Sequence, residues 1–263
     1  MSNYLEINKK SWNAKVQTHM ESDFYFLNEF IDGKNSLPEI DIHLLGDIQG
    51  KKILHLQCHF GQDSISMSRM GAQVTGVDFS DIALKNANEL AQKVGADTKF
   101  VFSDVYELPS VLDEKYDIIY TSYGTIGWLP NLDRWAGVVS HFLKPGGKLI
   151  FIDFHPFVWM YNDAFTEVSY NYFNTGPIQE TYEGTYADKS ADLVQEYVMW
   201  NHPTSEVINA LIKACITVER FDEYNYSPWP CFSDLVEFEK GKYRLEKFGD
   251  KIPMVFSVVG KKN

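Results

Sequence analysis

The residues best suited to bind a small polar ligand stand in one loop and at the end of the stretch that follows it. The loop reads HLQCHFGQD and carries Gln57, His59 and Gly61, and Asp78 ends the later stretch VTGVD. A carboxylate such as that of Asp78 can accept hydrogen bonds from the two hydroxyls of a ribose. Dinucleotide-binding loops place glycines where the backbone meets a pyrophosphate. In a register that starts at Gln57, those positions hold Gln57, His59 and Gln62. The loop therefore leaves little space for a pyrophosphate, but it can hydrogen-bond an amino-acid tail.

A strand, a tight loop, a helix and a second strand should position these residues. Residues 53–56 form a short apolar run rich in branched side chains, which predicts a strand covered on both faces. Gly61 allows a sharp turn, and Asp63 or Ser64 can cap the helix that follows. Residues 73–77 predict the second strand. A right-handed crossover brings the loop after strand one and the end of strand two to the same sheet edge, so the loop and the aspartate should meet there.

The two stretches together resemble a known sequence motif. HLQCHFGQD followed by VTGVDFS is similar to motif I of the class I S-adenosylmethionine-dependent methyltransferases, and the match extends over most of the chain. In that motif an acidic residue precedes glycines at alternating positions. Here His55 takes the acidic position, and Gln57 and His59 take two glycine positions. The resemblance implies S-adenosylmethionine as the cofactor and places His55 in the hydrogen-bond network behind it. It also implies cofactor contacts with Gln57, His59, Gly61, Asp78 and Phe79.

A third strand and the residues after it extend the predicted site. Ser80 can cap a helix that runs to about residue 94, and residues 98–102 predict a strand. Asp104 and Val105 follow this strand. In the family, this position resembles the acidic residue that reads the adenine amino group, so the resemblance gives Asp104 that role and packs Val105 on the ring. Without the resemblance, a turn or a helix cap explains Asp104 equally well.

A fourth apolar strand, residues 116–121, should end beside the first strand, where the strand order reverses. Thr121, Ser122 and Tyr123 are then expected at the reactive end of the ligand. We expect Thr121 and Ser122 to contact the cofactor. Tyr123, and Trp128 in the same loop, are candidates for contact with the substrate.

The rest of the pattern completes a doubly wound α/β fold. It predicts a helix over 132–142, a fifth strand over 148–154, a helix over 204–214 and strands over 216–224 and 253–259. The turn LKPGG before the fifth strand is frequent in the methyltransferase family, and the resemblance implies that the last strand inserts antiparallel. We therefore expect a mostly parallel, seven-stranded, Rossmann-like sheet with the last strand antiparallel.

The N-terminal segment, residues 1–46, is expected to cover the strand ends as a helical lid. It should contain helices over 4–13, 23–31 and 38–45. Trp12, Asn13, His19 and Tyr25 are the candidates for lid contacts, and Tyr25 is also a candidate substrate contact. Ordinary packing of the aromatic rings and a solvated histidine are the alternative explanation.

A second covering segment, residues 155–203, interrupts the alternation of strands and helices. Stretches over 165–172, 179–186 and 194–200 alternate polar and apolar residues, which predicts a small antiparallel β insert over the cofactor. Trp200 is its candidate substrate contact. The chain is then a single domain, 1–263, in which residues 47–154 and 204–263 form the cofactor-binding core.

Two histidines could serve as a general base. Methyl transfer from a sulfonium is an in-line displacement with a neutral leaving group, so the protein mainly aligns the reactants and excludes water. A base is required only where the acceptor must lose a proton. His155 and His202 are the catalytic candidates, because imidazole accepts protons near neutral pH, while a packed or solvated ring is the alternative. No metal site is expected, because His55 and His59 straddle a strand and a loop.

The composition of the chain limits the kinds of binding partner and cellular compartment that we expect. The chain has 263 residues and a net charge of −12 at pH 7, which disfavours binding to nucleic acid. Cys58, Cys215 and Cys231 have no close pairing, which favours free thiols in a reducing compartment. No apolar run approaches the roughly 20 residues of a membrane span, and the first residues lack the apolar centre of a signal peptide. We expect a cytoplasmic protein without a membrane partner. The sequence does not indicate the oligomeric state.

The predicted function is methyl transfer from S-adenosylmethionine to an unidentified small-molecule acceptor. Two alternatives stay open. A nicotinamide-dependent oxidoreductase would use a similar sheet, but the loop glycines for a pyrophosphate are missing. A non-catalytic protein of the same fold could bind the adenosyl ligand as a sensor or scaffold, because Gln57 and His59 depart from the motif.

Overall fold

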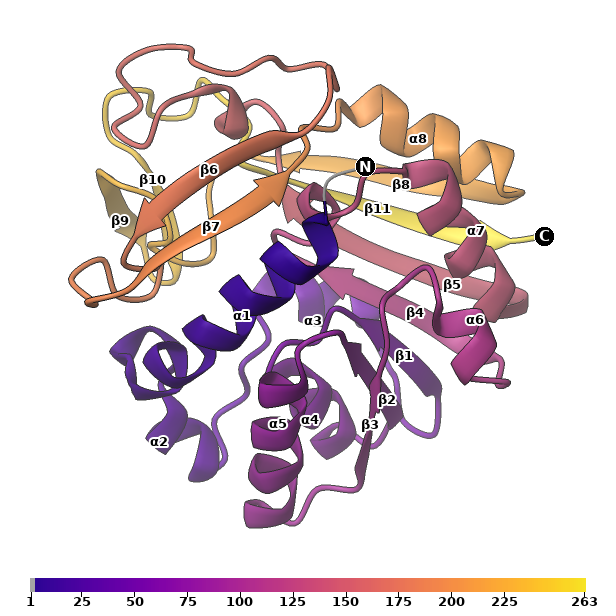
Figure 1. The fold of residues 1–263 in the computed structure, drawn as a ribbon. Coiled ribbons are helices and arrows are strands. Elements are labelled where there is room, and N and C mark those ends of the chain that lie inside the picture. Colours follow the sequence, from indigo (N-terminus) through magenta and orange to yellow (C-terminus); the bar gives the residue numbers. More distant parts are fainter. Residues whose placement is uncertain (1–2) are drawn as a thin grey trace.

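The fold is built on one seven-stranded sheet, seen in a computed structural model that describes residues 3–263 (Figure 1). Its strands, in chain order, are β1 (Lys52–Leu56), β2 (Gln73–Asp78), β3 (Thr98–Phe102), β4 (Tyr116–Ser122), β5 (Leu143–Phe154), β8 (Ile216–Tyr224) and β11 (Val255–Lys262). In space they follow the order β3-β2-β1-β4-β5-β11-β8. β1 pairs in parallel with β2 and β4, whereas β11 is antiparallel to both of its neighbours. The predicted architecture is confirmed. Residues 1 and 2 of the predicted N-terminal segment lie outside the described residues.

Helices cover both faces of this sheet. They are α3 (Glu39–Leu45), α4 (Gln62–Arg69), α5 (Asp81–Lys93), α6 (Leu108–Val111), α7 (Leu132–Phe142) and α8 (Thr204–Lys213), with short 3-10 turns η2 (Ile126–Trp128) and η3 (Val158–Met160). α3 and α4 pack with Ile53 on one face, and α7 and α8 pack with Leu54 on the other. Neighbouring strand residues point to opposite faces, so the apolar run of β1 is buried on both sides.

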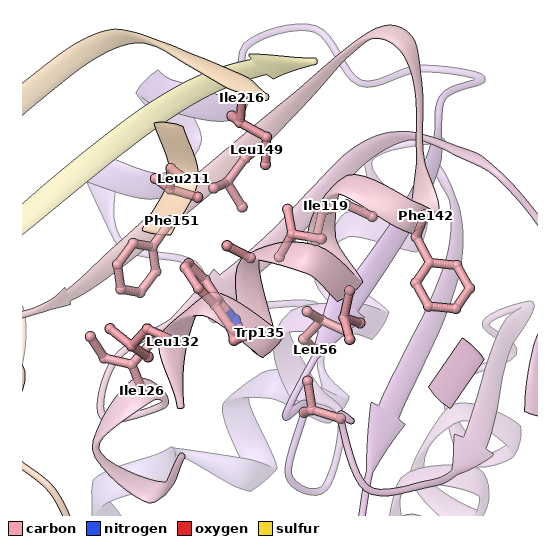
Figure 2. Close-up of a cluster of buried hydrophobic side chains, with 14 of the residues drawn as sticks. Leu56, Ile119, Ile126, Leu132, Trp135, Phe142, Leu149, Phe151, Leu211 and Ile216 are labelled. Atoms are coloured by element: carbon pink, nitrogen blue, oxygen red, sulfur yellow. The ribbon is translucent and has the colours of Figure 1, made fainter. Parts of the chain in front are cut away.

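Trp135 of α7 is fully buried in the apolar cluster between α7, α8 and the sheet (Figure 2). Its ring centroid lies 5.3 Å from that of Phe151 on β5. Leu56 of β1 and Ile119 of β4 belong to the same cluster. This core packs β1, β4 and β5 against one helix layer, and so it fixes where their carboxyl ends meet.

Local signals in the core were predicted with small errors. Ser80 caps α5 as expected, because its hydroxyl accepts a hydrogen bond from the amide of Ala83. The helix after the loop starts two or three residues earlier than expected, with Gly61 at the cap position instead of Asp63 or Ser64. The LKPGG turn lies inside β5, whose pairing with β4 jumps from Leu143 to Lys148.

The N-terminal segment holds α1 (Tyr4–Glu21), η1 (Asp23–Tyr25) and α2 (Leu27–Ile31). α1 is longer than the predicted helix over 4–13. The predicted helix over 23–31 is broken at Phe26, whose φ of 46° is left-handed and does not continue a helix. In Figure 1, α1 runs beside the hairpin strand β7 (Val194–Met199).

The insert is smaller than predicted. β6 (Ile178–Glu183) and β7 form one antiparallel hairpin. The predicted strand over 165–172 does not form, because Val168 makes only an isolated bridge and its side chain is exposed. A second hairpin, β9 (Leu235–Glu239) and β10 (Lys242–Leu245), lies in the loop between β8 and β11, where we predicted no strands. Gly241, with φ of 71°, makes its turn.

Candidate cofactor and active site

The loop after β1 keeps a backbone suited to glycine although two of its residues are not glycine. Gln57, His59 and Gly61 have φ of 56°, 51° and 80°, all in the left-handed region. A non-glycine residue there costs about 1–2 kcal/mol. Such strain persists where the surrounding structure holds it, and it is frequent at ligand sites. The glycine positions of the motif are thus retained in conformation, and Gln57 and His59 add side chains to them.

Asp78 lies where the loop and the end of β2 meet. One oxygen, Oδ2, accepts a hydrogen bond from the His59 amide at 2.8 Å, and Oδ1 accepts one from the Ser80 amide at 2.8 Å. Burial raises the pKa of Asp78 to about 6, and the backbone donors oppose this shift. An ionised carboxylate has about four acceptor positions. Asp78 therefore keeps capacity for two ribose hydroxyls.

Gln57 offers a second acceptor beside the loop. Its Nε2 donates to the carbonyl of Thr125 at 2.9 Å. Its Oε1 is buried and has no hydrogen-bond partner among residues 3–263. An unpaired buried acceptor costs about 1–3 kcal/mol, and a ligand ammonium would relieve it. The loop, Asp78 and Gln57 therefore fit an adenosyl amino acid.

The predicted adenine contacts lie at the end of β3. Asp104 is half-buried, and its carboxylate accepts a hydrogen bond from the Tyr106 amide at 2.9 Å. Burial raises its pKa, opposed by two backbone donors. Val105 is buried in the large apolar cluster, and Phe79 after β2 is half-buried. These placements agree with the predicted roles, which stay predictions.

The loop after β4 is held by Asp153 of β5, a residue whose structural role the sequence did not reveal. Its carboxylate accepts hydrogen bonds from the amides of Gly124, Thr125 and Ile126, and from the Thr125 hydroxyl at 3.1 Å. Thr121 is buried and donates to the Thr125 hydroxyl at 3.2 Å, and Ser122 is half-buried at the end of β4. Asp153 therefore fixes the loop that the Gln57 amide contacts.

α1 closes over these strand ends and is tied down on two sides. Asn8 exchanges two hydrogen bonds of 2.8 Å with the backbone of Val198 on β7. Asn13 accepts from the Ser80 hydroxyl at 2.6 Å and donates to Asp81 at 3.2 Å. Since Ser80 also donates its amide to Asp78, the helix lies directly over the candidate ribose site.

Two histidines meet where α1 crosses the loop. His19 Nδ1 and His59 Nε2 lie 2.9 Å apart, so one ring donates a hydrogen bond to the other. Burial lowers the pKa of His19 to about 2 and that of His59 to about 3, so both rings are neutral at pH 7. The ring of Tyr25 packs against both histidines, and its hydroxyl bonds to that of Tyr186. Tyr25 thus lies beside the loop after β1, and its contact with the substrate stays a prediction.

Beside this pair, α1 places Lys15 among three aromatic rings. Its ammonium lies 4.7 Å from the ring centroid of Trp12, 5.4 Å from that of Trp128 and 5.8 Å from that of Tyr197. Trp128 thus lies beside α1, and its contact with the substrate stays a prediction. Trp200 lies nearby, since its amide donates to the Gly127 carbonyl at 2.8 Å. Lys15 and Tyr197 were not singled out from the sequence, because nothing local marks them.

The structure does not bring His155 and His202 to the site with free ring nitrogens. His155 Nε2 lies 2.9 Å from a carboxylate oxygen of Glu223, and its Nδ1 accepts a hydrogen bond from the Phe157 amide at 3.1 Å. His202 Nε2 bonds to the Leu129 carbonyl at 2.8 Å, and Nδ1 lies 3.0 Å from Glu206. Both rings are hydrogen-bonded at both nitrogens, an arrangement that holds backbone in place and leaves no nitrogen for an acceptor proton.

Tyr123 is turned away from the loop after β1 and toward α3. Its hydroxyl donates to Asp41 at 2.8 Å, and the hydroxyl of Tyr120 donates to the other Asp41 oxygen. Behind the loop, His55 Nδ1 is 2.8 Å from the Ser64 hydroxyl, and its ring packs against Tyr120. Burial lowers the pKa of His55 to about 3, so it is a neutral hydrogen-bonding group in this network.

The buried Asp41 gives a prediction about pH and stability. Burial raises its pKa from 3.8 to about 7, opposed by the tyrosine donors. The folded protein therefore holds a proton that the unfolded chain has lost, and this contribution to stability disappears as pH rises from about 4 to about 7. As the pH rises over that range, the free energy of unfolding of Asp41→Asn should increase by about 2–4 kcal/mol relative to that of the unsubstituted protein. Urea unfolding at several pH values measures the difference.

Asp32→Asn, which replaces an exposed carboxylate, is the control for this prediction. His19, His55 and His59 act in the opposite direction, since their lowered pKa values make stability rise with pH in both proteins. A pH-independent difference for Asp41→Asn would show that the carboxyl is ionised throughout.

Three further observations delimit the site. Among residues 3–263, no group of three or more His, Cys, Asp or Glu side chains is arranged to hold a metal ion. Within the same residues, no helix has the length and apolar character needed to cross a bilayer. A cavity of about 490 Å³ lies at the amino ends of the parallel strands, where Gln73 begins β2 and Tyr116 begins β4. It is therefore separate from the strand ends that carry the candidate site.

Comparisons with known proteins agree with this geometry. Residues 53–147 match the family model described as a methyltransferase domain. An uncharacterized protein of Haemophilus influenzae is 25% identical over 85% of this chain and 87% of its own length. The ubiquinone biosynthesis O-methyltransferase of Chromobacterium violaceum is 31% identical over 56% of this chain, which spans 61% of that enzyme. The geranyl diphosphate C-methyltransferase of Streptomyces coelicolor has the same fold, with a TM-score of 0.63, 15% identity, and coverage of 100% of this chain and 99% of that one.

The order of the seven-stranded sheet and the match over residues 53–147 point to the same class of protein. The methyltransferase domain matched by residues 53–147 and the strand order of the sheet together support a class I S-adenosylmethionine-dependent methyltransferase. The predicted family and its cofactor, S-adenosylmethionine, are confirmed. The matched segment, 53–147, contains the loop after β1, Asp78 and Asp104.

Proposed function

We propose that this chain transfers a methyl group from S-adenosylmethionine to a small-molecule acceptor. One observation carries most of the proposal: the loop over residues 57–61 keeps the left-handed backbone of a glycine motif and donates the His59 amide to Asp78. The match to a methyltransferase domain favours this activity over nicotinamide-dependent oxidation. The alternative of a non-catalytic adenosyl-binding protein predicts ligand binding without methylated product.

The proposed cofactor contacts follow the strand ends. Asp78 would accept the ribose hydroxyls and Asp104 the adenine amino group, with Phe79 and Val105 beside the rings. Gln57 Oε1 would accept from the ammonium of the amino-acid tail, since it has no partner among residues 3–263. The remaining proposed contacts are His59, Gly61, Thr121 and Ser122. When bound, the cofactor supplies an electrophilic methyl group.

The domain organisation supports a covered site. We propose residues 1–46 as a helical lid, 155–203 as a substrate-covering segment, and 47–154 with 204–263 as the cofactor-binding core. Asp78 is only 7% exposed under α1. Ligand entry therefore requires α1 to move, and α1 should close again over the reactants to exclude water. Tyr25, Trp128 and Trp200 would contact the acceptor.

The proposed partner is one small molecule, in the cytoplasm. The net charge of −12 disfavours a polyanionic nucleic acid, because such partners are bound by positive faces. The Chromobacterium violaceum relative is named as an O-methyltransferase, so hydroxyl compounds, both phenols and alcohols, belong in the first acceptor panel.

Isothermal titration tests the proposal. We expect S-adenosylmethionine and S-adenosylhomocysteine both to bind with Kd below about 1 mM. Absence of heat from both ligands up to that concentration would contradict the proposal. Binding of both, without methylated product from a broad acceptor panel, would support the non-catalytic alternative.

A further inference from the structure

Lys15 is a buried lysine whose charge is not balanced. It is only 6% exposed, on the face of α1 that covers the strand ends. Among residues 3–263, no carboxylate lies within ion-pair distance of its ammonium. Three aromatic rings, those of Trp12, Trp128 and Tyr197, surround it instead. A lysine is almost never buried this far without a partner unless its position serves a function.

The groups facing Lys15 come from every element packed around it. His19 lies on the same helix and His59 in the loop after β1, and both are neutral at pH 7. Tyr197 lies on β7, and its hydroxyl donates to the carboxylate of Glu180 of β6 at 2.7 Å. Burial alone lowers the pKa of Lys15, to about 8. A substantial share of the protein therefore carries a neutral amine near pH 8.

The amine lies where three functional segments converge. The Trp12 ring contacts that of His59 in the cofactor loop, with centroids 5.3 Å apart, and that of Trp128 after β4 at the same distance. Trp128 in turn contacts Tyr197 of the covering hairpin, at 5.8 Å. Lys15 thus faces the junction of the cofactor loop, the end of β4 and the lid, which is where a methyl acceptor must meet the cofactor in this sheet.

We propose that Lys15 is the general base of the methyl-transfer reaction, and that the acceptor carries a proton on its attacking atom. This inference rests on the proposed function. In the step, a lone pair of the acceptor oxygen, nitrogen or sulfur forms the new bond to the methyl carbon. The carbon–sulfur bond of the donor breaks, and its electron pair remains on sulfur. The acceptor proton moves to the amine of Lys15, which becomes an ammonium.

The aromatic surroundings suit both states of this base. The cationic cofactor would disfavour a second positive charge nearby, which lowers the lysine pKa further and keeps the amine neutral before reaction. After proton transfer the donor is neutral, and the ring faces of Trp12, Trp128 and Tyr197 stabilise the new ammonium. A carboxylate partner would hold the proton permanently, and none lies within ion-pair distance of Lys15 among residues 3–263.

The base also constrains the acceptor. An amine whose conjugate acid has a pKa near 8 accepts a proton readily from groups with a pKa up to about 10, such as phenols and thiols, and poorly from aliphatic alcohols. The rings of Trp12 and Trp128 favour a flat molecule. The expected acceptor is therefore a phenol or catechol, not a sugar hydroxyl.

A binding experiment tests the charge of Lys15 without any acceptor. S-adenosylmethionine carries a sulfonium charge that S-adenosylhomocysteine lacks. The ratio to measure is the Kd of S-adenosylmethionine divided by the Kd of S-adenosylhomocysteine. In the unsubstituted protein this ratio should fall about tenfold or more between about pH 6.5 and about pH 9.5, because Lys15 loses the charge that repels the sulfonium. In Lys15→Met the ratio should change less than about threefold. In Lys15→Arg it should stay high.

The same pH dependence in Lys15→Met as in the unsubstituted protein would overturn the inference. Failure of both ligands to bind the unsubstituted protein would overturn the proposed function.

Kinetics with the best phenol of the acceptor panel distinguishes a base from a fixed positive charge. A general base predicts that Lys15→Met and Lys15→Arg both lose about 100-fold or more in kcat/KM. It also predicts that kcat/KM of the unsubstituted protein rises with pH to a plateau near the lysine pKa. Full activity in Lys15→Arg would overturn the inference, since it would show that Lys15 only pairs with an anionic acceptor. Lys10→Met, on the exposed face of the same helix, is the matched control and should keep full activity.

Discussion

Asp153→Ala is expected to lower the free energy of unfolding by about 3–5 kcal/mol. The substitution removes the acceptor for the amides of Gly124, Thr125 and Ile126, and for the Thr125 hydroxyl. Thr125 and Ile126 are buried, so their donors would be left without water or protein partners. Each unpaired buried donor costs about 1–3 kcal/mol. Urea unfolding followed by tryptophan fluorescence measures the loss.

Two variants separate this effect from a general effect of charge. Asp153→Asn keeps one acceptor oxygen and the side-chain shape, so it should lose less than the alanine variant. Asp133→Asn removes an exposed carboxylate that pairs with Lys213, and it should change stability by no more than about 0.5 kcal/mol. A loss below about 1 kcal/mol in Asp153→Ala would show that the loop donors find other partners.

The sheet could be predicted because its signals are local and periodic. Consecutive apolar residues in β1, such as Ile53 and Leu54, are buried on opposite faces, and this makes a continuous apolar run. Gly61, Ser80 and the LKPGG turn stand at real element boundaries or bends. The strand predicted over 165–172 failed for the opposite reason. Its alternation is real, but no neighbouring strand covers it.

The sequence indicated those candidate site residues that stand at the ends of strands. It did not indicate the residues whose positions depend on packing between distant segments. The place of Asp78 follows from the order of strands, whereas the role of Asp104 was implied by the family resemblance. The left-handed backbone of Gln57 and His59 does not follow from their types, which disfavour it. The buried position of Lys15 depends on Asn8, which ties α1 to Val198 far along the chain.

The two predicted bases illustrate the same limit. His155 follows β5 directly, and the order of strands predicts that it lies at the site. In the fold its ring pairs with Glu223 of β8, at the far edge of the sheet from β1. His202 is held by Glu206, one helical turn later. Sequence spacing identifies which histidines lie near a strand end, but partners from other strands decide whether a ring nitrogen is free.

Asp78→Asn is expected to weaken the binding of S-adenosylhomocysteine about 10- to 100-fold. The asparagine keeps one acceptor oxygen but turns an NH₂ group toward the amide of either His59 or Ser80, so it also loses acceptor positions for the ribose. Burial raises the pKa of Asp78 to about 6, and ribose hydroxyls donate best to the ionised form. Affinity in the unsubstituted protein should therefore fall as pH drops below about 6, and this fall should be absent in Asp78→Asn. Isothermal titration over this pH range measures both effects.

A ligand without ribose hydroxyls distinguishes a lost contact from a disturbed loop. The 2′,3′-dideoxy analogue of S-adenosylhomocysteine should bind weakly to the unsubstituted protein, and it should bind to Asp78→Asn with about the same affinity. The reason is that the missing hydroxyls and the substitution remove the same interaction. If Asp78→Asn weakened the analogue as strongly as the parent ligand, the substitution would be acting through the loop backbone. Asp97→Asn, an exposed carboxylate beside the cavity at the opposite sheet edge, should bind both ligands like the unsubstituted protein. Unchanged affinity of Asp78→Asn for S-adenosylhomocysteine would place the ribose elsewhere and remove the central contact of the proposed site.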